Sequence, residues 1–406
     1  MFLMEWLLAD NHYMNFIGIV AILGVAVAFS SNWRAISVKL IGAALAVQAL
    51  LATFILKTDV GAMVFSSMSH GIEQVYKFAD NGCAFVFGKL ADASGPWSFI
   101  FAVKVLPIII FFGALMALLF HIGVVQLIVR GIAFVIRPVF GTSGAETLSV
   151  AANSVLGQTE APLLIKNYLA RMTNSEMTTV MVSGMAHLSG AILAVYGLMG
   201  VPILHLLSAS IMAIPGAILI SKLLTPETET PETMGGSSVK IPRETKNILD
   251  AISTGTGDGL RLALNVAAML VAFISLMSLV DAILLGVTGW SLNAIFAKIF
   301  YVVAYGIGIM PSECQAAGTL LGQKLVINEF VAYSNMVTMG LSERSVAILT
   351  YALAGFSNFS CIGIQIGGIG AICPEKRETL TRLGMKALLG GTLANLLNAA
   401  IAGLFM

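Results

Sequence analysis

The stretch AETLSVAANSVLGQTEAPLL, residues 145–164, decides the fold together with SECQAAGTLLGQKLVINEFVAY, residues 312–333. Both stretches are apolar, yet glycines, amides and carboxylates interrupt them. Irregular backbone is tolerated at membrane depth only where it is buried in protein or lines a wet cavity, because unpaired N–H and C=O groups are costly in lipid. We therefore predict that the segments containing these two stretches, 141–172 and 309–338, are interfacial or re-entrant and point to a functional site.

The composition of the whole chain is that of a membrane protein, most of which is surrounded by lipid. Of 406 residues, 58% are hydrophobic and 11% are charged, whereas a soluble domain has about 25% charged residues. A helix needs about 20 mostly apolar residues to cross the hydrocarbon core. We predict an all-α polytopic membrane protein whose eight transmembrane helices lie near 13–30, 36–56, 98–121, 174–199, 201–223, 256–285, 342–368 and 381–405.

The remaining apolar segments, 60–95, 122–140 and 288–308, are interrupted by glycine, proline or charge and are predicted to be interfacial or re-entrant. The N-terminal stretch carries Glu5 and Asp10 and lacks the basic region of a signal peptide, so we expect the mature protein to retain it. The distribution of Lys and Arg places the polar linker 224–248 on the cytoplasmic side and both termini outside.

Charge and cysteine content exclude other classes of protein. A net charge of +1 with scattered basic residues gives no nucleic-acid surface. The four cysteines show neither the spacing of metal ligands nor that of a disulfide framework; they are Cys83, Cys314, Cys361 and Cys373.

The polar linker separates two halves that repeat one order of elements. In each half a long span leads to an interfacial stretch, a hairpin and a span broken by glycine and polar residues. Because the linker is cytoplasmic, the two copies enter the membrane from opposite sides, which predicts an inverted repeat. The predicted domains are 1–97, 98–223 and 249–406, with 224–248 between the last two.

Two glutamates lie in apolar segments predicted to be at membrane depth, where a charged side chain is unfavourable. A carboxylate near the bilayer centre costs at least ~2.5 kcal/mol on insertion scales, so Glu160 and Glu329 are candidates for a functional site. In the other interpretation each one is protonated, or is paired with Lys166 or Lys324, and only holds a hairpin in place.

Polar groups also gather at the two predicted helix breaks, GMAHLSGA at 184–191 and GFSNFSCIGI at 355–364. A broken helix exposes N–H groups at one new end and C=O groups at the other, and these can bind polar ligands and cations. Isolated polar residues in membrane helices also serve as interhelical contacts. Clustering beside glycine in both halves favours binding.

The motifs GQTEAPLL at 157–164, NEFVAY at 328–333 and GFSNFS at 355–360 resemble those of the concentrative nucleoside transporter family, here as a bacterial member. The similarity covers nearly the whole chain. It implies a multi-pass protein of the inner membrane that forms a homotrimer, with scaffold and transport subdomains in each protomer and 1–97 in the scaffold. It also implies a site built from two re-entrant helical hairpins, 141–172 and 309–338. No enzymatic activity is implied.

The resemblance also assigns residues to the substrate. It implies that the base is read by Gln158, Thr159 and Glu160, with apolar contact from Ile192. The ribose positions fall on Glu329, Asn358 and Phe356, followed by Ser360 and Cys361, where related members have a serine in place of Cys361. Ionised carboxylates accept strong hydrogen bonds from hydroxyls, and amides both donate and accept, as a base edge requires.

The coupling ion stays open at this stage. In sodium-coupled members the resemblance places sodium on Asn153, on the carbonyls of Leu156, His187 and Leu188, and on a hydroxyl whose position is His187 here. Sodium prefers oxygen ligands, whereas imidazole titrates near neutral pH and suits protons. His187 could also be a neutral, hydrogen-bonded histidine.

The sequence therefore predicts a secondary active transporter that imports nucleosides in symport with sodium or protons, without a cofactor. The alternative is a cation-coupled carrier of nucleobases or modified nucleosides. An intramembrane enzyme is disfavoured, because no HExxH or GxSxG motif is present. The preference for purines or pyrimidines and the number of cations moved are not determined.

Overall fold

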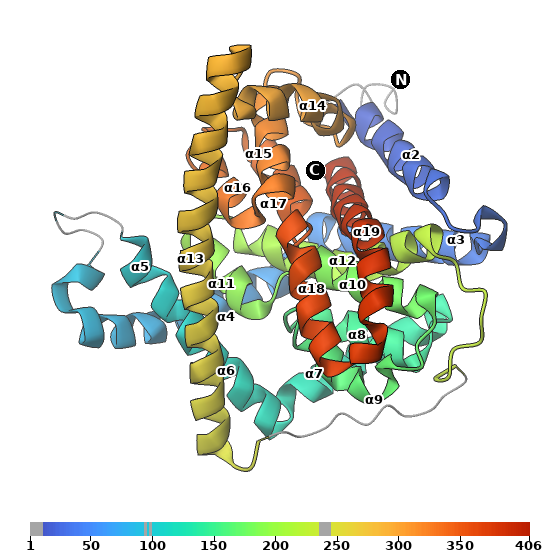
Figure 1. Ribbon diagram of the computed structural model, residues 1–406, viewed down its shortest axis with the longest axis horizontal. Coiled ribbons are helices and arrows are strands. Elements are labelled where there is room, and N and C mark those ends of the chain that lie inside the picture. The colour runs from blue at the N-terminus through green and yellow to red at the C-terminus, as the bar shows by residue number, and fades with distance from the viewer. Residues whose placement is uncertain (1–10, 93–95, 97–99, 235–244) are drawn as a thin grey trace.

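The computed structural model describes residues 11–92, 96, 100–234 and 245–406. Glu5 and Asp10, on which the prediction for the N-terminus rests, lie outside these residues. All regular elements in the described part are helices, as Figure 1 shows. The predicted all-α fold is confirmed.

All eight predicted spans are helical. They correspond to α2 (His12–Ala28), α3 (Val38–Lys57), α5 (Phe101–Lys104) with α6 (Leu106–Ile122), α10 (Asn174–Ala186) with α11 (Gly190–Leu198), α12 (Ile203–Leu224), α13 (Ile248–Thr288), α17 (Glu343–Leu353) with α18 (Phe359–Ile372), and α19 (Arg377–Leu404). Six of the eight are long and apolar enough to cross a membrane. The exceptions are α2, with 17 residues, and the divided run α17–α18.

The segments between the spans are helical as well. They form α4 (Asp59–Phe87), α7 (Val124–Phe140) and α14 (Leu292–Gly306), with short 3₁₀ turns at Trp33–Ala35, Gly88–Ala91 and Pro374–Lys376. In place of an interrupted stretch, α4 is one helix of 29 residues. An N-cap hydrogen bond from the Gly61 amide to the Thr58 hydroxyl, 3.0 Å long, starts it directly after α3.

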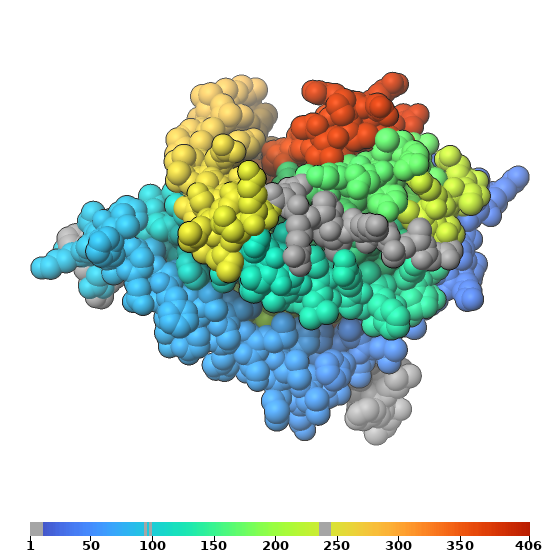
Figure 2. Space-filling view, turned by 90° about the horizontal axis from the view of Figure 1, so that it is seen from below, coloured from blue at the N-terminus to red at the C-terminus, as the bar shows by residue number. Residues whose placement is uncertain are grey.

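The longest helix, α13, runs the full height of the molecule in Figure 1 and lies at the surface in Figure 2, where it is yellow. Most of its side chains are exposed, as expected of a lipid-facing helix. It crosses α6 at very short range: a Cβ on Gly113 would lie 2.7 Å from the Gly255 carbonyl oxygen and 2.9 Å from the Gly259 Cα. Small residues permit this backbone approach in membranes.

The first predicted hairpin consists of α8 (Gly144–Asn153), a 3₁₀ turn at Ala161–Ile165 and α9 (Lys166–Leu169). Every residue of α8 is buried. The second consists of α15 (Cys314–Val326) and α16 (Glu329–Met336), and the Asn328 side chain caps α16 by accepting from the Val331 amide at 3.0 Å. Each hairpin thus places an irregular tip between helices.

The two helix breaks touch each other through backbone. Gly355, in the break between α17 and α18, has φ +103°, a conformation that other residues rarely adopt. A Cβ there would lie 2.6 Å from the carbonyl oxygens of both Met185 and Ala186, at the end of α10. Only glycine permits this contact between the breaks.

Candidate functional site

The two helices that begin after the breaks are each capped by a polar side chain. Ser189 accepts from the Ile192 amide at the start of α11, and Asn358 accepts from the Cys361 amide at 3.1 Å at the start of α18. Caps satisfy amides that have no partner within the helix. Several polar residues of the breaks are therefore held by local backbone geometry.

A continuous run of hydrogen bonds links the two hairpins across α18. Gln158 of the first hairpin donates to the Cys361 sulfur at 3.3 Å, and the Cys361 amide donates to Asn358. Asn358 in turn donates to the Glu329 carboxylate at 3.2 Å, which also accepts from the Tyr196 hydroxyl at 2.8 Å. All five residues are buried. All of them except Tyr196 were predicted from the sequence as substrate-binding residues, and the structure brings these four together.

Tyr196 and Gln365 were missed by the sequence analysis. Gln365, on α18, donates to the Gln158 side chain at 3.1 Å and to the Met181 carbonyl at 3.0 Å. Tyr196 lies four residues after Ile192 on α11, so both face the same side of that helix. This four-residue spacing from Ile192, a predicted substrate residue, could have identified Tyr196 from the sequence.

The rest of the first hairpin tip is more open. Glu160 accepts from the Gly157 amide at 3.2 Å and is exposed, as is Thr159. Thr159 lies close to α18, because a Cβ on Gly368 would be 3.1 Å from its methyl carbon. These two side chains keep polar atoms that can meet a ligand.

The remaining predicted substrate residues lie beside the same run. Ile192 is buried in the first turn of α11, Phe356 is half-buried in the second break, and the Ser360 hydroxyl donates to Asn358 at 2.6 Å. The Asn358 side-chain oxygen thus accepts from both the Ser360 hydroxyl and the Cys361 amide. The Cys361 sulfur accepts from the Gln158 side chain.

Asn153 and His187 meet through Ser183. The Asn153 amide donates to the Ser183 hydroxyl at 3.2 Å, while its Oδ1 is buried and has no hydrogen-bond partner among the described residues. His187 Nδ1 lies 2.8 Å from the Ser183 carbonyl, so that nitrogen carries the proton, because a carbonyl only accepts. Nε2 is buried without a partner.

The residues predicted to supply carbonyl ligands lie in the first helix break and at the tip of the first hairpin, which contact each other. Leu188 and His187 form the first break, and the Gly190 amide donates to the Val155 carbonyl at 3.1 Å, which holds the hairpin tip against α11. Leu156 follows directly. Asn153, three residues earlier, therefore ends α8 beside the carbonyl end of α10.

Lys324, which the sequence suggested as a partner for Glu329, bonds the backbone of the second break. Lys324 donates to the carbonyls of Ala352, at 2.8 Å, and Ala354, at 3.5 Å. It forms no ion pair within 4 Å of Glu329 among the contacts of the described residues. Glu329 instead takes its hydrogen bonds from Tyr196 and Asn358.

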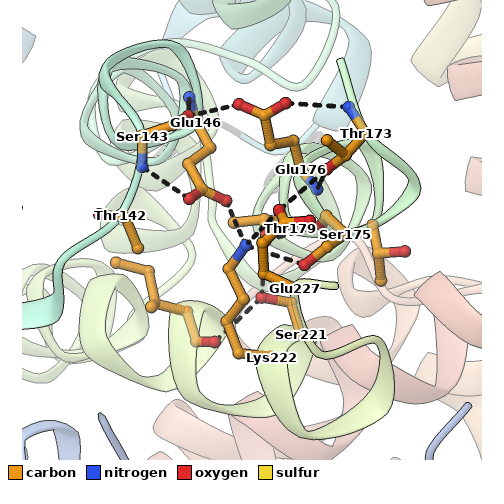
Figure 3. Close-up of polar contacts among 12 residues, drawn as sticks. Thr142, Ser143, Glu146, Thr173, Ser175, Glu176, Thr179, Ser221, Lys222 and Glu227 are labelled. Carbon is orange, nitrogen blue, oxygen red and sulfur yellow. Dashed lines mark hydrogen bonds and ion pairs between the residues drawn. The ribbon is translucent and has the colours of Figure 1, made fainter. Parts of the chain in front are cut away.

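A second polar cluster joins the starts of α8 and α10 to the end of α12 (Figure 3). Lys222 lies 2.7 Å from Glu146 and 3.7 Å from Glu227, and it donates to Ser175 at 2.9 Å. Glu146 and Glu176 each close a capping box at the start of their helix, and the two boxes are joined by Ser143, which donates to Glu176 at 2.5 Å. This cluster lies apart from the run of hydrogen bonds and was not predicted.

The described residues contain no group of three or more His, Cys, Asp and Glu that could hold a metal ion. All four cysteines are buried and free. The polar groups that do converge are amides, hydroxyls, carbonyls and single carboxylates. They suit hydrogen bonding to a polar organic solute.

Comparison with known proteins identifies the family. Residues 17–90 match the Na+ dependent nucleoside transporter N-terminus, residues 102–202 match the nucleoside recognition (Gate) family and residues 205–403 match the Na+ dependent nucleoside transporter C-terminus. The chain is 42% identical over 408 residues to an uncharacterized transporter of Haemophilus influenzae, covering 97% of each chain. It is 38% identical to the nucleoside permease NupC of Helicobacter pylori, covering 96% of this chain and 97% of that protein.

A solved structure gives the same result for the fold. The inward-facing, substrate-bound state of CNTnw matches with a TM-score of 0.93 and 39% identity, over 97% of this chain and 98% of that one. These relatives are transporters and permeases, which agrees with the prediction that the chain is not an enzyme. This multi-pass membrane protein belongs to the concentrative nucleoside transporter family.

Proposed function

We propose that this protein imports nucleosides across the inner membrane of a bacterium in symport with sodium. The observation that carries the proposal is the run of hydrogen bonds from Gln158 through Cys361 and Asn358 to Glu329. It brings an amide suited to a base edge and a carboxylate suited to ribose hydroxyls into one buried site. The likeness to a nucleoside permease of Helicobacter pylori and to the Na+ dependent nucleoside transporter family supports this substrate class.

In the proposed site, the base lies against Gln158, Thr159 and Glu160 with Ile192 as its apolar wall. The ribose lies against Glu329 and Asn358, and Phe356, Ser360 and Cys361 complete that end. The half-buried or exposed positions of Thr159, Glu160, Phe356 and Ser360 leave them able to contact a solute. A site that pairs its carboxylate with a hydroxyl rejects analogues that lack it, because its own buried group would stay unpaired.

Sodium is proposed as the coupling ion because the buried Asn153 Oδ1 lacks a partner beside the carbonyls of the first break. Amide and carbonyl oxygens fit sodium. We place it among Asn153, Leu156, His187 and Leu188, with His187 contributing its backbone carbonyl. The His187 ring serves as a neutral hydrogen-bond donor to Ser183. The working assembly is proposed to be a homotrimer, with 1–97 in the scaffold and the hairpins in the moving part.

Uptake into proteoliposomes tests this function. Tritiated uridine and adenosine are supplied under an inward sodium gradient, an inward proton gradient or both. Uptake above the equilibrium level is expected with sodium alone and is lost in Glu329→Gln, while Glu375→Gln, on an exposed carboxylate, transports as wild type. Uptake driven only by protons would overturn sodium coupling, and full activity in Glu329→Gln would overturn the site.

Competition separates nucleosides from the alternative cargo. Excess unlabelled uridine is expected to suppress uptake of the tritiated compound far more strongly than excess uracil does. Equal competition by the free base would favour a nucleobase carrier, because the ribose contacts would then contribute nothing.

A further inference from the structure

Lys324 is a buried cation that the proposed transport mechanism does not use. Its side chain is 3% exposed and extends from the last turn of α15. Its ammonium donates to the carbonyls of Ala352 and Ala354, where α17 ends and the second break begins. A buried ammonium is tolerated only when it is hydrogen-bonded and its charge is compensated.

The end of α17 supplies part of that compensation. The last carbonyls of a helix lack partners within the helix and form the negative end of its dipole. Glu329, five residues along the chain from Lys324 in the same hairpin, reaches the second break from the other side, where its carboxylate accepts from the Asn358 side chain at 3.2 Å. Lys324 and the carboxylate assigned to the ribose therefore contact the same helix break, Lys324 at the end of α17 and Glu329 at the start of α18.

The first break has the same arrangement with one difference. There α10 ends at the break, and the residue that approaches from the last turn of the hairpin helix is Asn153. Asn153 brings a buried oxygen without a partner. One helix break therefore receives a ligand for a cation, and the other receives the cation itself.

We propose that Lys324 is a tethered cation that fills, at the second break, the place that the transported cation takes at the first. It is a positioning residue: it fixes the carbonyl end of α17 and keeps Glu329 charged and oriented for the ribose. This rests on the proposed function for the role of Glu329. The cation at the second break is covalently attached to the chain, so the ribose end of the site is set before any ion binds.

Nucleoside affinity of purified protein in detergent, measured by calorimetry at saturating sodium, tests the role of the charge. Lys324→Met keeps most of the length of the side chain and removes its charge, and it is expected to weaken uridine binding by about 30-fold or more. Lys324→Arg retains the charge and its donors, and should bind within about fivefold of wild type, since one tenfold step corresponds to only 1.4 kcal/mol. Wild-type affinity in a folded Lys324→Met would overturn the proposal.

Chemical rescue distinguishes a missing cation from a damaged fold. Lys324→Ala is expected to recover nucleoside binding when n-propylammonium is added, while n-propanol at the same concentration has no effect. Equal rescue by the alcohol would mean that Lys324 only fills space, which contradicts the proposal.

A double-mutant cycle on thermal stability covers the case in which Lys324→Met folds poorly or no nucleoside binds. If Lys324 acts through Glu329, adding Glu329→Gln to Lys324→Met is expected to restore part of the lost Tm, whereas independent effects would add and overturn the proposal. The stabilisation by sodium alone should stay unchanged in Lys324→Met. A wild-type protein that binds no nucleoside but shows this coupling would refute the proposed function and leave the tethered cation supported.

Discussion

Lys222 and Glu146 form an ion pair of 2.7 Å in which the side chains are only 9% and 1% exposed. The pair joins the end of α12 to the start of the first hairpin (Figure 3). It therefore ties the helix that precedes the polar linker to the hairpin assigned to the base.

Lys222→Met is predicted to destabilise the protein strongly. Removing one partner of a buried pair leaves the other charge uncompensated, at a cost of about 3–5 kcal/mol. Thermal unfolding in detergent measures the loss, and adding Glu146→Gln should restore part of it. Arg171→Met is the matched control, because its pair with Glu232 is exposed and such pairs contribute at most about 1 kcal/mol. Equal losses in the two single variants would contradict the assignment of a buried, stabilising pair.

Tyr196→Phe is predicted to weaken nucleoside binding about tenfold, because it removes a buried hydrogen bond to Glu329 and leaves that carboxylate oxygen without its donor. Calorimetry on purified protein measures the change. Tyr305→Phe serves as the control. The Tyr305 hydroxyl forms a 2.7 Å hydrogen bond with the Tyr13 hydroxyl, outside the proposed site, so this variant should bind nucleoside as wild type does. Unchanged affinity in Tyr196→Phe would show that the carboxylate is held without it.

Asn153→Ala is predicted to raise the sodium concentration needed for half-maximal uptake by about tenfold or more, the loss expected for one oxygen ligand of the ion. Uptake at graded sodium concentrations in proteoliposomes gives this value. Asn293→Ala, on the exposed side of α14, should leave it unchanged. If both variants respond to sodium as wild type does, the cation lies elsewhere.

Glu313 predicts a pH dependence at the start of the second hairpin. Burial alone would raise the pKa of this carboxyl, but hydrogen bonds from the Ser345 hydroxyl and from the amide and hydroxyl of Ser342 hold the pKa below its usual value. A lowered pKa in the folded state stabilises the protein above the unfolded pKa, and this contribution is lost as the pH falls through the folded pKa.

The Tm difference between wild type and Glu313→Gln should therefore be full at pH 7 and shrink steadily below about pH 4, the ordinary range for a glutamate. Glu343→Gln, on a nearby exposed carboxylate, should show no such trend. A difference that is constant with pH would mean that the charge of Glu313 does not stabilise the fold.

The sequence was sufficient for the elements that depend on composition along the chain. Long apolar runs predicted the spans, and glycine with polar neighbours predicted both breaks, because these residues end a helix wherever it packs. The positions of Gln158, Glu329 and Asn358 followed from a family resemblance. Their mutual hydrogen bonds are a finding of the structure.

Other features depend on how helices pack and could not be predicted. The residues Glu146, Glu176 and Lys222 come from three separate helices, and nothing in their spacing indicates that they meet. Tyr196 was overlooked because a tyrosine in an apolar run is ordinarily read as core. Lys324 was considered as a partner for Glu329, whereas its hydrogen bonds go to the end of α17.

The contact at Gly355 limits how the protein can change shape. Main chain meets main chain there, with the carbonyls of Met185 and Ala186 in the space that any other side chain would need. We therefore expect the segments assigned to base and to sugar to move together, as one piece, in any change of conformation. A bound nucleoside would then keep its contacts to both the base-binding and the ribose-binding residues during the movement. The inward-open and outward-open states would differ only in which parts of the protein surround these segments.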